Sequence, residues 1–397
     1  MVSMIMSSRN VNNNKNDNAF LRAWEDACQW KGRSRVWIPS GVYMVNSVRF
    51  VGPCNGEIAF EIRGGLKAPV KPSLFLTDTW IGFQYVNDLT VEGGGFLDGQ
   101  GYYAWKFNDC HQNTNCKPLP ANLRFDFINN SRIQYIKSIN SKNIHINLFA
   151  CNKINVTNVI LRAPENSPNT DGIHIGTSTN LLIQNVNIGT GDDCISMISG
   201  SKNITISEVS CGPGHGISIG SLGKAFEKEY VSGIKVLNSN FTRTQNGVRI
   251  KTWAPSLPSL ASDITFSGLF MNTVWNPIVI DQNYCPHSLC GNLERSQVRI
   301  RDVTFKDIGG TSNSEVAINL QCSKLVPCQN VILDNINLAY NGPKKSHAVS
   351  SCSNVVANYK AKLSTSYKLH ISSIHIYFNP NLSSELFGCY IPGHLDI

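Results

Sequence analysis

Short runs in which apolar and polar residues alternate recur along most of this 397-residue chain. Alternation at every second position is the period of a strand that buries one face. From Leu182 onward, successive runs begin 22, 30 and 30 residues apart. Dipeptides that close hairpins are scarce between the runs, which favours parallel coils over a sandwich. The clearest expected strands are 144–147, 154–156, 182–186, 204–206, 234–236, 264–266 and 303–305.

The apolar spacing changes near the N-terminus. Phe20, Trp24, Ala27 and Cys28 recur at helical spacing, and Asp17 stands where an N-cap residue would. A solenoid must close its open end, so we expect this amphipathic helix to cover the first coil.

Three segments are expected from these patterns. Residues 1–16 are polar and should be a disordered or truncated leader. Residues 17–358 should form a single coiled domain that carries the chemistry. Residues 359–397 should form an atypical C-terminal tail, because they continue without the earlier pattern.

Polar motifs follow several of the expected strands. Neighbouring parallel strands lie about 4.8 Å apart, so successive coils would bring Asp171 near Asp192 and Asp193. Adjacent residues of a regular strand face opposite ways, so these two neighbours can act together only at a bend, and Gly191 before them suits one. A lone Asp pair is most often a solvated turn. The motifs are Asn-Thr-Asp-Gly at 169–172, Gly-Asp-Asp-Cys at 191–194, Gly-Pro-Gly-His-Gly at 212–216 and Arg-Ile-Lys at 249–251.

Candidate partners for this acidic cluster come from the later motifs. His215 lies between two glycines, which would let the backbone approach a ligand closely. Arg249 and Lys251 are two residues apart, so they share one strand face while Ile250 points into the core. An Arg fork beside an ammonium is a suitable carboxylate receptor, although a pair of cations on a strand is often only surface.

The four motifs, in this order and spacing, resemble those of the polygalacturonases, which are glycoside hydrolases of family 28 that hydrolyse pectin. The resemblance spans about residues 19–355 and implies an all-β, right-handed parallel β-helix with a capping helix. It also implies hydrolysis of α-1,4-galacturonosyl linkages with inversion, without a metal or other cofactor. The segment 108–120 favours the exo-acting plant branch.

The same resemblance implies a role for each candidate residue. Asp192 would be the general acid, Asp171 and Asp193 would activate the water, and His215 would orient the acid or tune its protonation. An inverting pair holds its carboxyl groups far enough apart for a water molecule. The residues expected to bind substrate are Asn169, Arg249, Lys251 and Tyr284.

Charge and composition agree with an anionic partner. The formal net charge is +8 and the pI is about 8.8, which suits an acidic polysaccharide such as pectin. The Lys and Arg residues are scattered and no nucleic-acid module is recognisable, so we expect no nucleic-acid partner. No window is long and apolar enough to predict a membrane span. We expect a monomer.

Thirteen cysteines indicate an oxidising compartment. Their spacings lack the patterns of zinc sites and instead suggest disulfides, with Cys194 and Cys211 flanking one coil and further close pairs at 110 and 116, 285 and 290, and 322 and 328. We therefore expect secretion to the extracellular space or cell wall, although no signal peptide is recognisable at the start of the chain. Glycosylation acceptor triplets begin at Asn129, Asn155, Asn203, Asn240 and Asn381.

Other functions fit parts of the sequence. An endo-acting polygalacturonase would share every motif. A pectate lyase would need a calcium site, which Asp171, Asp192 and Asp193 could in principle supply, but the motifs at 212–216 and 249–251 argue against it. A non-catalytic pectin-binding wall protein would need none of the intact acidic residues. The glycine-rich stretch at 93–95 lacks the Gly-Lys-Ser/Thr of a phosphate-binding loop.

Overall fold

The computed structural model describes residues 3–5, 13–108, 113, 116–224, 227–286, 295–343 and 346–360. Within it the chain divides into two compact units, Met1–His215 and Gly216–Ile397. Cys110, Cys290, Cys389, Asn381 and the tail from 361 lie outside the described residues.

The first unit consists mostly of short strands in two parallel sheets. One sheet contains β1 (Ser3–Ile5), β2 (Ser34–Ile38), β3 (Val42–Met44), β5 (Ile58–Ile62), β6 (Gly65–Lys67), β8 (Leu89–Glu92), β9 (Phe96–Asp98), β11 (Asn129–Gln134), β12 (Lys137–Ile139), β14 (Asn152–Thr157), β15 (Ile160–Arg162), β17 (Thr179–Gly189) and β19 (Lys202–Cys211). The other contains β4 (Val48–Val51), β7 (Thr79–Gln84), β10 (Ala121–Asp126), β13 (Ile146–Phe149), β16 (Ile173–Gly176) and β18 (Ile195–Met197).

The second unit also has two parallel sheets, and several of its strands, such as β24, are longer. One sheet contains β21 (Tyr230–Leu237), β22 (Asn240–Thr242), β24 (Ser259–Val274), β26 (Val298–Ser312), β28 (Cys328–Tyr340) and β30 (Val355–Lys360). The other contains β20 (Ile217–Leu222), β23 (Asn246–Trp253), β25 (Asn276–Tyr284), β27 (Val316–Gln321) and β29 (Val349–Ser353). Each expected strand lies in or overlaps a strand of the structure.

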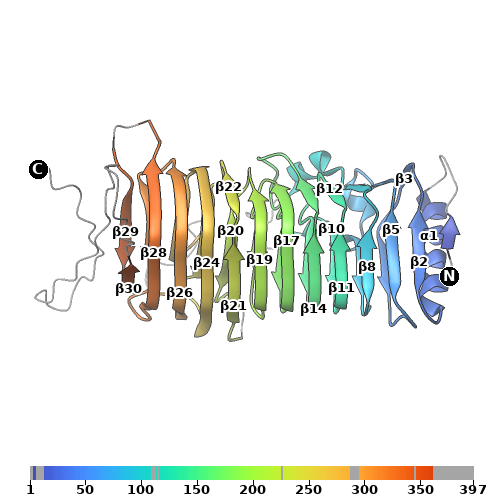
Figure 1. Cartoon of the computed structure of the whole chain (residues 1–397). Coiled ribbons are helices and arrows are strands. Elements are labelled where there is room, and N and C mark those ends of the chain that lie inside the picture. Colours follow the sequence, from blue (N-terminus) through green and yellow to red (C-terminus); the bar gives the residue numbers. More distant parts are fainter. Residues whose placement is uncertain are drawn as a thin grey trace, which may run out of the picture. The chain divides into compact units, whose positions relative to one another are not determined.

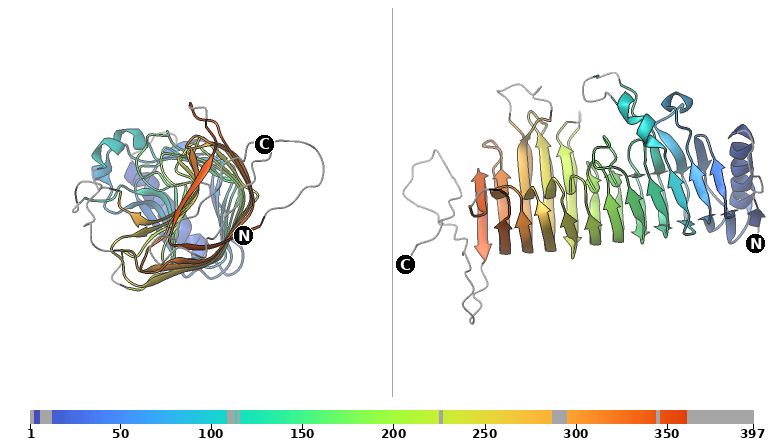
Figure 2. Two further views of the ribbon diagram at one scale, coloured as in Figure 1. Left: turned by 90° about the vertical axis from the view of Figure 1, so that its left-hand side faces the viewer. Right: turned by 90° about the horizontal axis from the view of Figure 1, so that it is seen from above.

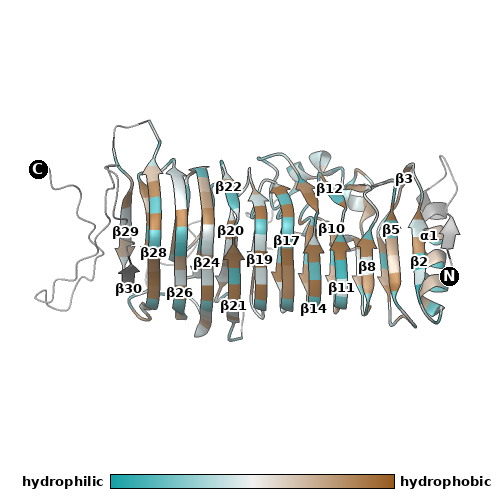
Figure 3. Cartoon of the chain, viewed as in Figure 1, coloured by the Kyte–Doolittle hydropathy of each residue, from teal (hydrophilic) through white to brown (hydrophobic). Residues whose placement is uncertain are grey.

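Alternation along the strands builds the core. In β19, Ile204, Ile206 and Val209 are fully buried, and polar residues between them face outward. β17 pairs with β19 so that Leu181 lies beside Ile204 and Ile183 beside Ile206. Like residues therefore stack from coil to coil, and apolar and polar bands alternate along β17 in Figure 3. The apolar side chains thus pack inside the coils and against the neighbouring coil, as in a solenoid.

Asparagine ladders fix one corner of the first unit. Asn152, Asn180 and Asn203 each donate a side-chain hydrogen bond to the asparagine of the preceding coil, starting at Asn129, over 2.8, 2.8 and 2.6 Å. Asn180 and Asn203 have φ values of 58° and 53°, in the left-handed region that asparagine tolerates better than most residues. The amide chain thus holds the corner in register.

A helix covers the core at the N-terminal end, as the apolar spacing predicts. α1 (Asn13–Gln29) lies beside β2 in Figure 1 and buries Phe20, Trp24 and Ala27. The Trp24 ring centroid lies 5.1 Å from that of Phe50 in β4.

The start of this helix differs from the prediction. It begins at Asn13, and Asp17 lies inside it, so the prediction that Asp17 is the N-cap was wrong. The Asp17 carboxylate instead accepts hydrogen bonds from the backbone N and side-chain Nδ2 of Asn46, over 2.9 and 2.7 Å. The segment 1–16, expected to be a leader, includes the first residues of α1 and the strand β1, which runs parallel to β2. The single-domain boundaries remain a prediction.

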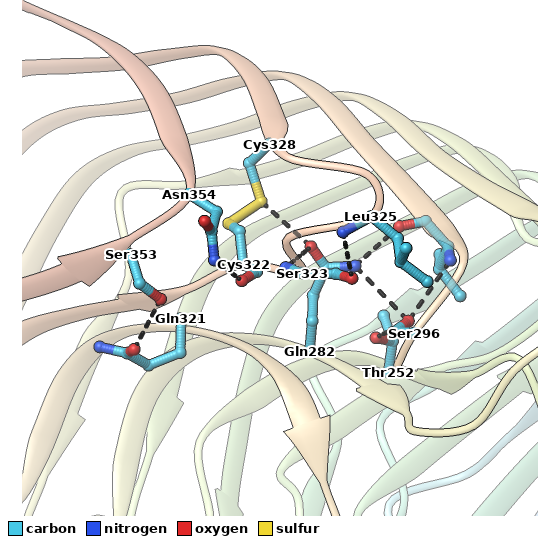
Figure 4. The surroundings of a disulfide bond; sticks show 11 residues. Thr252, Gln282, Ser296, Gln321, Cys322, Ser323, Leu325, Cys328, Ser353 and Asn354 are labelled. Atoms are coloured by element: carbon cyan, nitrogen blue, oxygen red, sulfur yellow. Dashed lines mark hydrogen bonds between the residues drawn. A yellow bond between two sulfur atoms is a disulfide. The ribbon is translucent and has the colours of Figure 1, made fainter. Parts of the chain in front are cut away.

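Disulfides close three of the described segments. Cys194–Cys211 joins the residues that flank one coil, and Cys322–Cys328 closes a short loop shown in Figure 4; both pairs follow the sequence spacing. Cys28–Cys54, which ties the end of α1 to the segment after β4, was not anticipated. Cys116, Cys285 and Cys352 are also disulfide-bonded. Cys151 is free and buried, and burial raises the pKa of its thiol to about 12.

Three short 3₁₀ turns interrupt the first unit. They are η1 (Pro72–Leu74), η2 (Gly101–Tyr103) and η3 (Trp105–Phe107). η2 and η3 project beyond the strands in Figure 2 and lead to Asn108. Among the described residues, no helix has both the length and the apolar character needed to cross a membrane.

Candidate active site

Two adjacent turns of the first unit carry the three candidate carboxylates. Asp171 precedes β16 by two residues, and Asp192 and Asp193 stand in the turn before β18. β16 pairs with β18 so that Ile173 lies beside Ile195, and the backbone N of Gly172 donates to the Asp193 carbonyl over 2.9 Å. Asp171 is therefore beside Asp193 on the neighbouring coil. The predicted bend at the Asp pair is confirmed.

Close backbone packing sets the shape of these turns. A Cβ on Gly191 would meet the Ser167 carbonyl oxygen at 2.1 Å, so a larger residue would force the two turns apart. The Gly191 N–H donates to the buried Thr170 Oγ1 over 2.9 Å. The glycine before the Asp pair is therefore required by the contact between coils as well as by the bend.

Asp192 accepts hydrogen bonds from three directions. Its Oδ1 lies 2.8 Å from the Asp193 backbone N and 3.1 Å from His215 Nδ1. Its Oδ2 accepts from Asn169 Nδ2 over 3.3 Å. The side chain is 20% exposed, so the carboxyl group is held in place and still reaches solvent.

His215 reaches Asp192 because the chain before it can pack tightly. Gly214 has φ +147°, and a Cβ there would lie 2.8 Å from the Asp192 carbonyl oxygen. That carbonyl accepts the backbone N–H of His215 over 2.9 Å. The backbone and the imidazole of His215 thus both bind Asp192, which gives a physical reason for glycine at 214.

Asp171 is held by two residues that the sequence analysis missed. Ser196 Oγ donates to Asp171 Oδ2 over 2.8 Å, and His174 Nδ1 lies 2.7 Å from Ser196 Oγ. Because the one serine proton points to the carboxylate, the serine oxygen accepts from His174 Nδ1–H. His174 and Ser196 are register partners in β16 and β18. The sequence could have indicated His174 and Ser196, because both stand at outward-facing strand positions just after an Asp turn.

The remaining residues of the first-unit site differ in burial. Asp193 is 2% exposed, whereas Asn169 is exposed and has φ 54°. Asn108, at the end of η3, donates from Nδ2 to Asn169 Oδ1 over 2.8 Å. Asn108 therefore orients the amide that donates to Asp192, a contact the sequence alone did not reveal.

A metal ion could in principle bind some of these groups. Asp192, Asp193 and His215 each offer one ligand atom, and these atoms lie within 4.8 Å of one another. Calcium prefers six to eight oxygen ligands, so an imidazole nitrogen suits it poorly. His215 Nδ1 also already faces Asp192 Oδ1. Among the described residues, this group contains His215 and not Asp171, so it does not supply the three carboxylates that the lyase alternative would use for calcium.

The second unit places the two candidate cations on β23. Ile250 between them is fully buried, as predicted. Arg249 Nε donates to Ser218 Oγ over 3.1 Å. Lys251 is only 8% exposed, and its Nζ lies 5.3 Å from the ring centroid of Tyr284. A lysine this buried is not an ordinary surface cation.

Aromatic and acidic neighbours complete this group. The Tyr284 ring centroid lies 5.3 Å from that of Trp253, in an edge-on arrangement. Asp281 is the register partner of Lys251. Burial raises the pKa of the Asp281 carboxyl, against the opposing effects of the Asn283 N–H and the Arg249 charge. The second unit thus places Lys251 beside Tyr284, with Arg249 two residues away on the same strand. The first unit brings together Asn169, Asp171, Asp192, Asp193 and His215.

Known proteins resemble this chain over most of its length. The profile described as glycosyl hydrolases family 28 matches residues 28–364. An exopolygalacturonase of Platanus acerifolia is 47% identical, over 87% of this chain and 91% of its own. An exopolygalacturonase of Oenothera organensis is 44% identical, over 87% of this chain and 95% of its own. A polygalacturonase of Gossypium barbadense is 46% identical, over 85% of this chain and 82% of its own.

Solved structures share the fold at low identity. An endo-xylogalacturonan hydrolase from Aspergillus tubingensis matches 90% of this chain and 100% of its own with a TM-score of 0.75 and 19% identity. An exopolygalacturonase from Thermotoga maritima matches 86% of this chain and 88% of its own, with a TM-score of 0.67 and 17% identity. The fold is the expected right-handed parallel β-helix with an N-terminal capping helix. Because the family profile and these relatives match most of its length, the chain belongs to the glycosyl hydrolases of family 28.

Proposed function

We propose that this glycoside hydrolase is a polygalacturonase that cleaves α-1,4-galacturonosyl linkages with inversion and acts from the chain end. The observation that carries the proposal is the position of Asp192. Its carboxyl group accepts hydrogen bonds from His215 Nδ1 and Asn169 Nδ2. Asp171 and Asp193 stand on the same two adjoining turns. Glycosidic cleavage needs this kind of grouping, because one carboxyl group must donate a proton while another takes one from water.

In this mechanism Asp192 protonates the glycosidic oxygen as the bond to the anomeric carbon breaks. Asp171 and Asp193 take a proton from the water that attacks the opposite face of the sugar. The Ser196 hydrogen bond fixes Asp171 Oδ2, and the Asp193 backbone N–H fixes Asp192 Oδ1. The carboxyl groups would therefore meet the substrate already oriented, which lowers the entropic cost of the reaction.

The basic group of the second unit supports an acidic sugar as substrate. Galacturonate carries one carboxylate on each ring. An Arg guanidinium can bind a carboxylate through two N–H groups, and a nearly buried Lys gains more from an anionic partner than an exposed one does. Arg249 and Lys251 fit those roles, and Tyr284 supplies an aromatic surface beside them. Asn169 would contact the sugar next to the acid.

Exo action is the more specific part of the proposal. It is supported by relatives named exopolygalacturonase in Platanus, Arabidopsis and Oenothera, at 44–47% identity. Endo action is the alternative, because other relatives of similar identity carry the name polygalacturonase alone.

The deciding experiment incubates the full-length protein with de-esterified polygalacturonate at about pH 5. We expect the parent to release new reducing ends without early loss of viscosity, and Asp192→Asn to release no reducing ends. Rapid viscosity loss would mean endo action. A folded protein that releases no reducing ends would overturn the hydrolase proposal in favour of binding alone. Unsaturated, ultraviolet-absorbing products that disappear with a chelator would instead indicate a lyase.

We also propose that the enzyme is secreted to the cell wall, where it acts as a monomer on pectin. The Cys194–Cys211 and Cys322–Cys328 disulfides support an oxidising compartment. The net charge of +8 favours an anionic polymer. Fractionation of the tissue that expresses the protein, with detection of N-glycans at the predicted acceptors, tests the location.

A further inference from the structure

The second unit contains a groove that takes no part in the proposed chemistry. Its volume is about 900 Å³, and it crosses the sheet that contains β21, β24, β26 and β28, whereas Arg249 and Lys251 lie on β23 of the other sheet. The lining residues combine cations with apolar side chains, among them Lys228, Tyr230, Leu260, Arg299, Arg301 and Leu325.

The floor of the groove is set by strand register. Tyr230 pairs with Leu260, and Leu260 pairs with Arg299, so these three residues form a row across three neighbouring strands. Neighbouring strands lie about 4.8 Å apart. Arg301 extends the floor two residues along β26 and pairs with Gln329 of β28. An extended ligand lying across the strands would thus meet an aromatic ring, an aliphatic side chain and a guanidinium in sequence.

One wall of the groove is a covalently closed loop. The Cys322–Cys328 disulfide encloses Leu325, Val326 and Pro327, as Figure 4 shows for Leu325. Ser323 holds this loop from inside, because its Oγ accepts the Leu325 N–H over 3.2 Å. The wall is therefore preorganised, and Leu325 remains 61% exposed on it.

Gln282 anchors this loop to the body of the second unit. Its Oε1 accepts the Ser323 N–H over 3.0 Å, and its Nε2 donates to the Val298 carbonyl over 2.7 Å. Gln282 is fully buried. The loop and the first residue of β26 thus bind the same side chain, which fixes the wall relative to the floor.

The charge of the groove is one-sided. Among the described residues that line it, Lys228, Arg299 and Arg301 are cationic and none is Asp or Glu. Arg301 is partly neutralised by Asp302, at 2.7 Å. Lys228 and Arg299 are exposed and remain as the principal positive groups. Arg299 and Arg301 repeat, on another sheet, the two-residue spacing of Arg249 and Lys251.

We propose that this groove is a second binding site, which holds an anionic polysaccharide chain of the polyuronate class without cleaving it. Carboxylates along such a chain match the guanidinium of Arg299 and the ammonium of Lys228. The apolar faces of its sugar rings match Tyr230, which is 54% exposed, and Leu325. The site would keep the enzyme on a polymer between cleavage events and would add nothing for a disaccharide that fills only the catalytic site.

The test compares two double variants of the full-length chain in an Asp192→Asn background, so that binding is measured without turnover. Lys228→Ala/Arg299→Ala removes the two groove cations. Arg132→Ala/Lys137→Ala removes two exposed cations of the first unit and gives the same net charge. Affinity for de-esterified polygalacturonate is measured by calorimetry at low and at physiological salt.

We expect the groove variant to bind the polymer about tenfold more weakly and the control to bind like its parent. Tyr230→Ser alone should weaken binding about threefold through lost ring stacking. With Asp192 restored, the groove variant should show a higher KM for polymer, an unchanged kcat, and unchanged kinetics on digalacturonate. Equal losses in both double variants, or no loss in the groove variant, would overturn the proposal.

The binding of the polymer in the groove is tested independently of the proposed catalysis. Groove-dependent binding by a protein that releases no reducing ends would leave the second site in place and remove the hydrolase proposal. Hydrolysis with no groove dependence would do the reverse.

Discussion

His215 Nδ1 lies 3.1 Å from Asp192 Oδ1, and the His215 backbone N–H donates to the carbonyl of the same aspartate over 2.9 Å. One residue therefore holds both the backbone and the carboxyl group of the proposed acid. The imidazole does not need to touch the reacting bond in order to affect it, because it fixes the orientation of the group that does.

Replacing His215 by Ala should lower kcat on polygalacturonate by a factor of about 10² to 10³. KM should change little, because the variant loses the orientation of Asp192 and keeps the contacts that bind the substrate. Initial rates of reducing-end release measure this effect. His347→Ala, at a described position outside the site, serves as the control. A large rise in KM with unchanged kcat would instead make His215 a substrate-binding residue.

Ser196→Ala should lower kcat about tenfold and leave KM nearly unchanged. The substitution removes the 2.8 Å hydrogen bond to Asp171 Oδ2 and the link to His174. Kinetics over a range of pH are the informative measurement, because a hydrogen bond to the ionised carboxylate favours that form, and its loss should move the lower pH limit of activity upward. Ser239→Ala, another buried serine, should change neither quantity. An unchanged pH profile would mean that Ser196 is only structural.

Lys251→Met should raise KM for polygalacturonate about tenfold with a smaller effect on kcat. Methionine keeps much of the length and apolar character of the side chain, and it removes the charge that would meet a galacturonate carboxylate. The matched control is Lys235→Met, an exposed lysine on β21. If neutral, fully methylated pectin showed the same change in KM, charge recognition by Lys251 would be contradicted.

His145 should make the fold less stable in acid. Burial lowers the pKa of its imidazole from 6.5 to about 3, and its Nε2 has no hydrogen-bond partner among the residues that the structure describes. Below pH 6.5 the unfolded chain therefore binds a proton that the folded chain does not. The free energy of unfolding falls from pH 6.5 down toward pH 3, with a loss from this residue of about 2 kcal/mol at pH 5.

Urea unfolding at several pH values measures this dependence. His145→Gln should have a flatter profile between pH 7 and 5 than the parent, whatever its absolute stability. Parallel profiles would show that the imidazole does not carry the acid sensitivity.

Cys28→Ser/Cys54→Ser should lower the free energy of unfolding by about 3 kcal/mol, because the disulfide closes a long segment between α1 and the chain after β4. The Cys322–Cys328 pair closes a much shorter loop, so its removal should cost less. Urea titration under non-reducing conditions compares the two variants. The larger loss in the Cys322 variant would contradict the loop-closure argument.

Much of the architecture could be predicted from local patterns. Alternation located β14, β17 and β19, because every second residue of each strand packs into the coil. The Asp turns could be placed at bends because adjacent strand residues face opposite ways. Those inferences depend only on neighbours in sequence.

Contacts between coils were harder to predict. Ser196 meets Asp171, and Asn108 meets Asn169, only because of register and a projecting turn. The start of α1 was misplaced because Asp17 has a polar side chain suited to a cap, whereas its carboxylate binds Asn46 from a distant turn. The Cys28–Cys54 pair likewise joins positions that no short motif links.

Asp171, Asp192 and Asp193 stand in turns, while the apolar residues that build the coils stand in strands. Mutations can therefore alter the turn residues and the apolar strand residues independently of each other. A substitution or insertion in a turn can alter which polymer is accepted while the stack of strands is preserved, and a substitution of a buried apolar strand residue alters the stability of the fold without changing the groups that carry the chemistry. This division lets one coiled scaffold diversify its substrates while its folding information stays intact.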